Sequence, residues 1–167
     1  MKLFSKPIDT TAPLAVVAPS AGNRIEVSPV SFQPQAVVPK AARFFKIPHV
    51  VVRSQLNGEI DYWDLHNRLD PSSPAIINLN IGTTFKGAID NIDRILEVLE
   101  ARGIKKFYIH CDGALGAMLL PYQKPGWVSF NRPIHSLSIS GHKFIGCPFP
   151  CGIVLTHNAL AACRRKV

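Results

Sequence analysis

Residues 75–114 contain the feature that most constrains the fold, a strand, a helix and a second strand in succession. AIINLNIG (75–82) is an apolar run of strand length, AIDNIDRILEVLEARG (88–103) has apolar residues at helical spacing, and KFYIHCDGA (106–114) is a second strand. The apolar stripe of the helix consists of Ile89, Ile92, Ile95, Leu96 and Leu99. Gly103 is expected to end the helix. This βαβ unit predicts parallel strands joined by a right-handed crossover.

The neighbouring segments extend the unit into an α/β architecture. The further expected elements are a short helix in VPKAARFF (38–45), a buried strand in HVVVRS (49–54), a helix in DYWDLHNRL (61–69) after a turn at Asn57-Gly58, and strands at about 134–139 and 152–156. We therefore predict an open, twisted, mostly parallel sheet with flanking helices.

The composition agrees with a single globular domain preceded by a leader. The chain has 167 residues, of which 47% are hydrophobic and 18% charged, and a chain of this length buries about 68–70% of the surface of its unfolded form. Residues 1–36 carry five prolines and few charges, which predicts an extended or disordered segment. We place the α/β domain at residues 37–167.

The net charge of +8 comes from scattered basic residues, apart from Lys105-Lys106 and the cluster at 164–166. A basic stripe interleaved with aromatic residues is missing, so we expect no nucleic-acid partner and keep an anion-binding module as a weaker alternative. No apolar run approaches the ~20 residues of a membrane span. Because Pro13 and Pro19 interrupt the apolar start, we expect no secretory signal and a cytoplasmic location, with organellar targeting by the leader left open.

The four cysteines, at positions 111, 147, 151 and 163, do not form the paired C-x-x-C clusters of structural zinc sites. Reduced thiols are the simpler interpretation, although Cys147 and Cys151 could pair or bind a metal ion. We predict no metal site.

Ligands of open α/β sheets bind beyond the carboxyl ends of the strands, and two of these ends carry small or carboxylate side chains. The turn Gly82-Thr83-Thr84 places two hydroxyls after the first strand, either as an ordinary turn or to bind phosphate or phenolic oxygens. Asp112 follows the second strand beside Gly113 and Ala114. This carboxylate either caps local amides or faces a cationic ligand, with room for a flat group.

The third strand end reads Ser140-Gly141-His142-Lys143 and continues into apolar residues. A lysine removed from water becomes an amine nucleophile that forms a Schiff base with an aldehyde, whereas the alternative is a lysine that reaches solvent. A carboxylate for a pyridine nitrogen, a lysine for an aldehyde and hydroxyls for oxygens are together the groups that bind pyridoxal 5'-phosphate. The combination therefore predicts that cofactor.

Three segments, NLNIGTTFKGAIDNID, FYIHCDGALGAMLLPY and SLSISGHKFIGCPFPCGIVL, resemble the group II pyridoxal-phosphate-dependent amino-acid decarboxylases. Among these, the histidine decarboxylase-like proteins and the plant serine decarboxylases are most similar. The resemblance covers about residues 37–157 and implies a partial large domain of a fold-type I pyridoxal-phosphate enzyme, a decarboxylase (carboxy-lyase) of amino-acid metabolism acting on histidine, serine or a related amino acid.

The resemblance also implies residue roles. Lys143 is the catalytic, Schiff-base lysine, and the spacing of Ser136, Lys143 and Cys151 fits the family's lysine segment. Asp112 is the partner of the pyridine nitrogen, and Asp90 supports it. The remaining expected cofactor contacts are Ala114 against the ring, Ser140 and His142 at the phosphate, and Thr84 near the cofactor oxygens.

The chain also departs from the family pattern. Gln35 stands where the family has a ring-stacking histidine, and family members are considerably longer, so the resemblance implies a truncated fragment of the cofactor domain. A homodimer, or association with a full-length relative, is expected to complete the pocket. The alternative function is that of a catalytically inactive truncated paralogue, or gene-model fragment, which at most associates with such a relative.

Overall fold

The computed structural model describes residues 15–19 and 37–157, which contain a six-stranded sheet in the order β2-β1-β3-β4-β5-β6. The strands are β1 (Ala15–Pro19), β2 (His49–Val52), β3 (Ala75–Asn80), β4 (Phe107–Asp112), β5 (Ser136–Ser140) and β6 (Gly152–Thr156). All neighbours pair in parallel except β5 and β6, which are antiparallel. The predicted mostly parallel α/β fold is confirmed.

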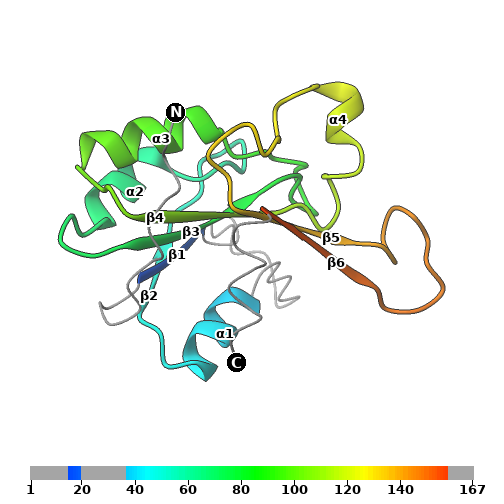
Figure 1. The fold of residues 1–167 in the computed structure, drawn as a ribbon, viewed down its shortest axis with the longest axis horizontal. Helices are drawn as coiled ribbons and strands as arrows, with labels where there is room; N and C mark the ends of the chain where they lie inside the picture. The colour runs from blue at the N-terminus through cyan, green and yellow to red at the C-terminus, as the bar shows by residue number, and fades with distance from the viewer. Residues whose placement is uncertain (1–14, 20–36, 158–167) are drawn as a thin grey trace.

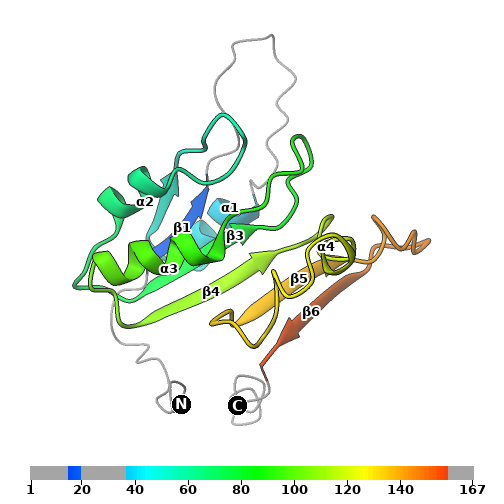
Figure 2. The ribbon, with the colours of Figure 1, turned by 90° about the horizontal axis from the view of Figure 1, so that it is seen from above.

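The helices lie on both faces of the sheet, as Figure 1 shows. They are α1 (Val37–Phe44), α2 (Tyr62–Arg68), α3 (Ile92–Ala101) and α4 (Leu120–Gln123). Helices α2, α3 and α4 cover one face, while α1 lies on the other. Seen from above, α3 runs alongside β3 and β4, the two strands that it connects (Figure 2).

The predicted βαβ unit is present, but its helix begins later than expected. Strands β3 and β4 pair in parallel from Ala75 and Phe107 to Asn80 and Asp112. Helix α3 begins at Ile92 because the side chain of Asn91 accepts the N–H groups of Asp93 and Arg94, at 3.0 and 3.3 Å. This N-cap satisfies amides that the first turn leaves free, so residues 88–91 lie outside the helix.

The structure differs from the predicted leader at Ala15–Pro19, where β1 lies between β2 and β3 and pairs with both. The five residues AVVAP form one apolar run that is too short for a periodic pattern, and only pairing with strands distant in the sequence makes it a strand. Residues 1–14 and 20–36 of the predicted leader lie outside the described residues. The domain boundary at residue 37 stays a prediction.

The hydrophobic core lies between the sheet and helices α2 and α3. Alternate residues of β3 and β4 point into it, including the fully buried Ile77, Leu79 and Ile109. The core side chains of α2 and α3 are Leu65, Ile92, Ile95 and Leu99. The sequence pattern identified this helical stripe correctly, except that Ile89 and Leu96 are only partly buried.

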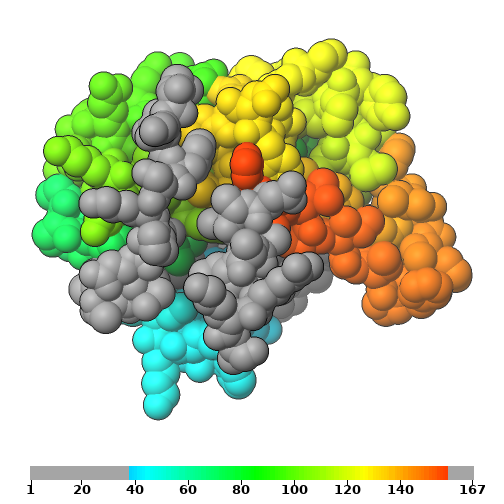
Figure 3. All heavy atoms as spheres, viewed as in Figure 1, coloured from blue at the N-terminus to red at the C-terminus, as the bar shows by residue number. Residues whose placement is uncertain are grey.

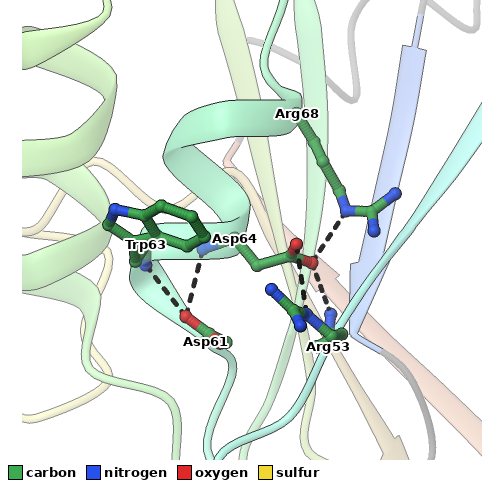
Figure 4. A network of polar contacts seen from close by, with 5 residues as sticks. All are labelled: Arg53, Asp61, Trp63, Asp64 and Arg68. Carbon is green, nitrogen blue, oxygen red and sulfur yellow. Dashed lines mark hydrogen bonds and ion pairs between the residues drawn. The ribbon is translucent and has the colours of Figure 1, made fainter.

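A buried carboxylate ties α2 to the end of β2 (Figure 4). Asp64 accepts the backbone N–H of Arg53 at 2.9 Å and the Nε–H of Arg68 at 2.7 Å. Burial alone would raise the pKa of Asp64, but these hydrogen bonds and the two guanidinium charges outweigh burial and lower it. Asp61 caps the same helix by accepting the N–H groups of Trp63 and Asp64.

Candidate functional site at the carboxyl ends of β3, β4 and β5

The carboxyl ends of three neighbouring strands lie at one edge of the sheet. Asn80 of β3 pairs with Asp112 of β4, and Asp112 pairs with Ser138 of β5, so the three residues stand level across the sheet. The loop that follows each strand therefore begins at the same edge. These loops carry the residues that the sequence analysis singled out.

Two glycines let the first two loops approach each other. A Cβ on Gly82 would lie 2.8 Å from the Cα of Gly116, and a Cβ on Gly116 would lie 2.4 Å from the carbonyl oxygen of Ile81. Gly82 also has a φ of +83°, a conformation that favours glycine. The loop after β3 thus contacts the loop after β4 through backbone atoms.

Asp112 is the last residue of β4, and its side chain is half-buried. Its Oδ1 accepts the N–H of Ala114 at 3.1 Å, which fixes one carboxylate oxygen in the first turn of the loop. The carbonyl of Ala114 in turn accepts the N–H of Ser140 at 3.2 Å. Ala114 therefore links the loop that carries Asp112 to the end of β5.

The lysine loop, residues 141–151, is closed by backbone hydrogen bonds around Gly141. The N–H of Gly141 donates to the carbonyl of Cys151 at 2.9 Å, and the N–H of Cys147 donates to the carbonyl of Gly141 at 3.1 Å. The N–H of Lys143 donates to the carbonyl of Ser140 at 3.2 Å. Lys143 thus lies one turn beyond β5, and its side chain is exposed.

The ring of His142 helps to close this loop. The backbone N–H of Cys151 lies 3.1 Å from its Nδ1. The carbonyl oxygen of Cys151 lies 3.1 Å from the same nitrogen. His142 is exposed, so its ring is accessible to a ligand oxygen.

Thr84 and Asp90 occupy different surroundings. Thr84 is exposed in the loop after β3, where the hydroxyl of its neighbour Thr83 accepts the N–H of Ala88 at 3.0 Å. Asp90 is fully buried and accepts the N–H groups of Ile60 and Asn80, each at 2.7 Å. Burial raises the pKa of Asp90 to about 6 despite these two bonds. Asp90 therefore acts on the backbone of β3, next to the strand of Asp112.

The sequence analysis assigned no role to His110, which lies close to Asp112. The two residues are two positions apart on β4 and share one face of the sheet, together with Ser136 and Ser138 of β5. The ring nitrogens of His110 lie 2.7 Å from the hydroxyl of Ser136 and 3.2 Å from that of Ser138. The period of two in FYIHCD and SLSIS was the signal that could have identified this cluster.

Other predicted features can be located only in the described part of the chain. Among residues 15–19 and 37–157, no three His, Cys, Asp or Glu side chains are grouped to hold a metal ion. None of the helices described is long and apolar enough to cross a membrane. Cys111, Cys147 and Cys151 are free thiols. Gln35, Cys163 and the basic cluster at 164–166 lie outside the described residues.

Comparison with known proteins matches most of the chain to one family. The model of the pyridoxal-dependent decarboxylase conserved domain matches residues 24–164. The chain is 50% identical over 121 residues to serine decarboxylase 2 of Oryza sativa subsp. japonica. This match covers 70% of the chain and 26% of the relative. The chain is also 46% identical over 133 residues to the histidine decarboxylase of Solanum lycopersicum, and this match covers 77% of the chain and 32% of the relative. The chain thus spans about a quarter to a third of these relatives.

Solved structures show the same fold. Catharanthus roseus tryptophan decarboxylase matches 93% of this chain with 33% of its own, at a TM-score of 0.68 and 17% identity. Lactobacillus brevis glutamate decarboxylase matches 87% of this chain with 32% of its own, at a TM-score of 0.65 and 24% identity. Since the family model matches most of the sequence, including all three loops of the site, the chain belongs to the pyridoxal-dependent decarboxylase family.

Proposed function

We propose that this chain binds pyridoxal 5'-phosphate at the carboxyl ends of β3, β4 and β5 and contributes to decarboxylation of an amino acid such as serine or histidine. The observation that carries the proposal is the meeting of Asp112, Ser140 and the Lys143 loop at one edge of the sheet. The names of the relatives, serine and histidine decarboxylases, support the substrate class.

The donor set fits the cofactor. Asp112 offers a carboxylate to a protonated ring nitrogen, and the exposed Lys143 offers a primary amine to the aldehyde. The hydroxyls of Ser140 and Thr84 and the ring of His142 offer polar groups to phosphate or phenolic oxygens. Ala114 is small enough to leave room for a flat ring beside Asp112.

The chemistry that the bound cofactor supplies is withdrawal of the electrons left on the substrate's α-carbon when carbon dioxide departs. The protein's contribution is to hold the reacting groups. Asp112 keeps a proton on the ring nitrogen, and the Ala114 N–H keeps the carboxylate in position for it. Lys143 would hold the cofactor through its side-chain amine. Asp90 supports Asp112 indirectly, through the backbone of Asn80.

The exposure of Lys143 supports a partner in the working protein. Its neighbours Phe144, Ile145 and Phe149 are exposed apolar residues of the same loop, and such a cluster favours burial against another chain. We propose a second copy, or a longer relative, as that chain. We also propose a cytoplasmic location, supported by the free thiols Cys111, Cys147 and Cys151.

The test mixes the purified chain with pyridoxal phosphate, reduces the mixture with borohydride and locates the adduct by mass spectrometry. We expect stoichiometric modification of Lys143, and its loss in Lys143→Ala. Lys105→Ala is the matched control, because Lys105 is also exposed but precedes β4, at the end of the strand opposite the three loops. That variant should be modified like the wild type.

Labelling scattered over surface lysines would contradict the proposal. The chain would then have the family's fold without its cofactor chemistry, which is the expected behaviour of an inactive truncated paralogue. A specific adduct would justify decarboxylase assays with serine and histidine, in which release of carbon dioxide must depend on Lys143.

A further inference from the structure

His110 lies beside the candidate site in a polar cluster that the proposed function does not use. The side chain is partly buried on β4, two residues before Asp112. Its Nδ1 lies 2.7 Å from the Oγ of Ser136 and its Nε2 lies 3.2 Å from the Oγ of Ser138. Both ring nitrogens therefore have hydroxyl partners, which fix the orientation of the ring.

The groups that face His110 from the adjacent strands carry no charge. Strand β3 places Asn78 at the position paired with His110, and β5 contributes Ser136 and Ser138. Among the described residues, the charge that acts on the His110 ring is that of Asp112. Residues two apart on a strand are about 7 Å apart, close enough for charges at a half-buried sheet face to interact.

Two opposing effects set the protonation of His110. Burial lowers its pKa, and the negative charge of Asp112 acts in the opposite direction but is the weaker effect. A neutral ring is satisfied by the two serines, because a hydroxyl can either donate to or accept from an imidazole nitrogen. At neutral pH the cluster therefore adds no positive charge beside Asp112 on this strand.

We propose that His110 is a positioning residue for Asp112: its neutral ring leaves the Asp112 carboxylate to the cofactor's ring nitrogen, and its protonated ring competes for that carboxylate. The role rests on the proposed function, since Asp112 must face a cationic ring. Protonated His110 would also repel the protonated ring nitrogen. Cofactor affinity should therefore fall as His110 becomes protonated.

The first test needs no cofactor. The imidazole signals of His110 are followed by NMR against pH in the wild-type chain and in Asp112→Asn. We expect the titration midpoint of His110 to move lower in Asp112→Asn, because the charge that favours the protonated ring is removed. His66, which lies on α2 and not on β4, serves as the internal control. An unchanged His110 midpoint would overturn the proposal.

The second test measures the dissociation constant of pyridoxal phosphate between pH 5 and pH 8 for the wild type and His110→Gln. Ionisations of the cofactor and of Lys143 affect both proteins and cancel in the ratio of the two constants. We expect the wild type to lose affinity relative to His110→Gln by about threefold to tenfold as the pH falls, the range of a charge interaction over this distance. A ratio that is constant with pH would show a merely structural role.

Two further outcomes separate this inference from the proposed function. If the NMR coupling is present but no cofactor binds at Lys143, the proposed function fails and the role of His110 toward the cofactor fails with it, while its coupling to Asp112 stands. If His110→Gln does not fold, Ser138→Ala replaces it, because this change removes only the partner at Nε2. If the affinity of Ser138→Ala for pyridoxal phosphate depends on pH as that of the wild type does, the role of Ser138 in holding the His110 ring is overturned.

Discussion

Asp90 shows how a single side chain supports the site without being part of its exposed edge. Its two carboxylate oxygens accept the N–H groups of Ile60 and Asn80, which are 30 and 10 residues away in the chain. One buried group thus holds the segment before α2 against the end of β3. Because Asn80 stands level with Asp112, this support reaches the candidate site through the backbone.

Replacing this carboxylate should destabilise the chain. In Asp90→Asn the amide nitrogen would face one of the two N–H donors, so we expect a loss of about 1–3 kcal/mol in the free energy of unfolding at pH 7, the cost of an unsatisfied buried donor. Urea denaturation followed by circular dichroism measures this loss. A loss below the experimental error would contradict the role given to Asp90.

The same residue should make stability depend on pH. Burial raises the pKa of Asp90 from 3.8 to about 6, so the folded chain holds this proton more tightly than the unfolded chain does. The stability that protonated Asp90 adds to the folded chain is therefore fully present below about pH 3.8. It is lost as the pH rises through 6. Asp90→Asn should lack this decline between pH 4 and 6. Asp70→Asn is the control, because hydrogen bonds from Ser72 lower the pKa of Asp70 and move its effect below that window.

At the scale of elements, the site depends on how closely the loops after β3 and β4 can approach. Gly82 and Gly116 meet through backbone atoms, and either one would lose this contact if it carried a side chain. The loop of Asp112 and Ala114 is held on its other side by the hydrogen bond from Ser140 to Ala114. The position of Asp112 therefore depends on two neighbouring loops, one from each side.

Gly116→Ala should separate these loops. The new Cβ would lie 2.4 Å from the carbonyl oxygen of Ile81, which is backbone and cannot rotate away. We expect a loss of about 1–3 kcal/mol in stability, typical of overpacking, and reduced modification of Lys143 by pyridoxal phosphate. Gly152→Ala is the matched control, since a Cβ on Gly152 meets no atom within 4 Å. Equal stability of the two variants would show that the close approach is not required.

At the scale of the whole molecule, the described sheet ends in two outer strands, β2 and β6, that pair on one side only. Strand β6 continues from the lysine loop and lies at the rim of the sheet in Figure 2, and the space-filling view in Figure 3 shows the lysine loop projecting at one end of the molecule. Val154 of β6 is 66% exposed. An outer strand with exposed apolar side chains favours pairing with another chain.

A charge on this strand should reduce association between chains. We expect Val154→Lys to lower the mass measured by light scattering at high protein concentration, because a lysine on an outer strand opposes strand pairing. Its thermal midpoint should stay close to that of the wild type, since Val154 is exposed. Leu56→Lys, at an even more exposed position in the turn before α2, should not alter the mass. If the two variants associate to the same degree, β6 is not the contact.

The sequence by itself determined the parts of this protein that depend on neighbours in the chain. Apolar spacing identified the stripe of Ile92, Ile95 and Leu99, and the segments AIINLNIG and KFYIHCDGA correctly predicted β3 and β4 as strands. Parallel pairing then required Asp112 and the segments containing Thr84 and Lys143 to follow strands that end at one edge. The family also follows from these local segments, because their residues are contiguous.

The tertiary structure alone decided the features that join distant residues. It placed β1 inside the sheet, brought Gly82 against Gly116, gave Asp90 two backbone partners and set His110 between two serines of β5. It also left Lys143 exposed. No local pattern by itself encodes these contacts, although alternation in FYIHCD and SLSIS puts His110 and the two serines each on one face of its strand. Each contact depends on the order of the strands and on the close packing of segments that are far apart in the chain.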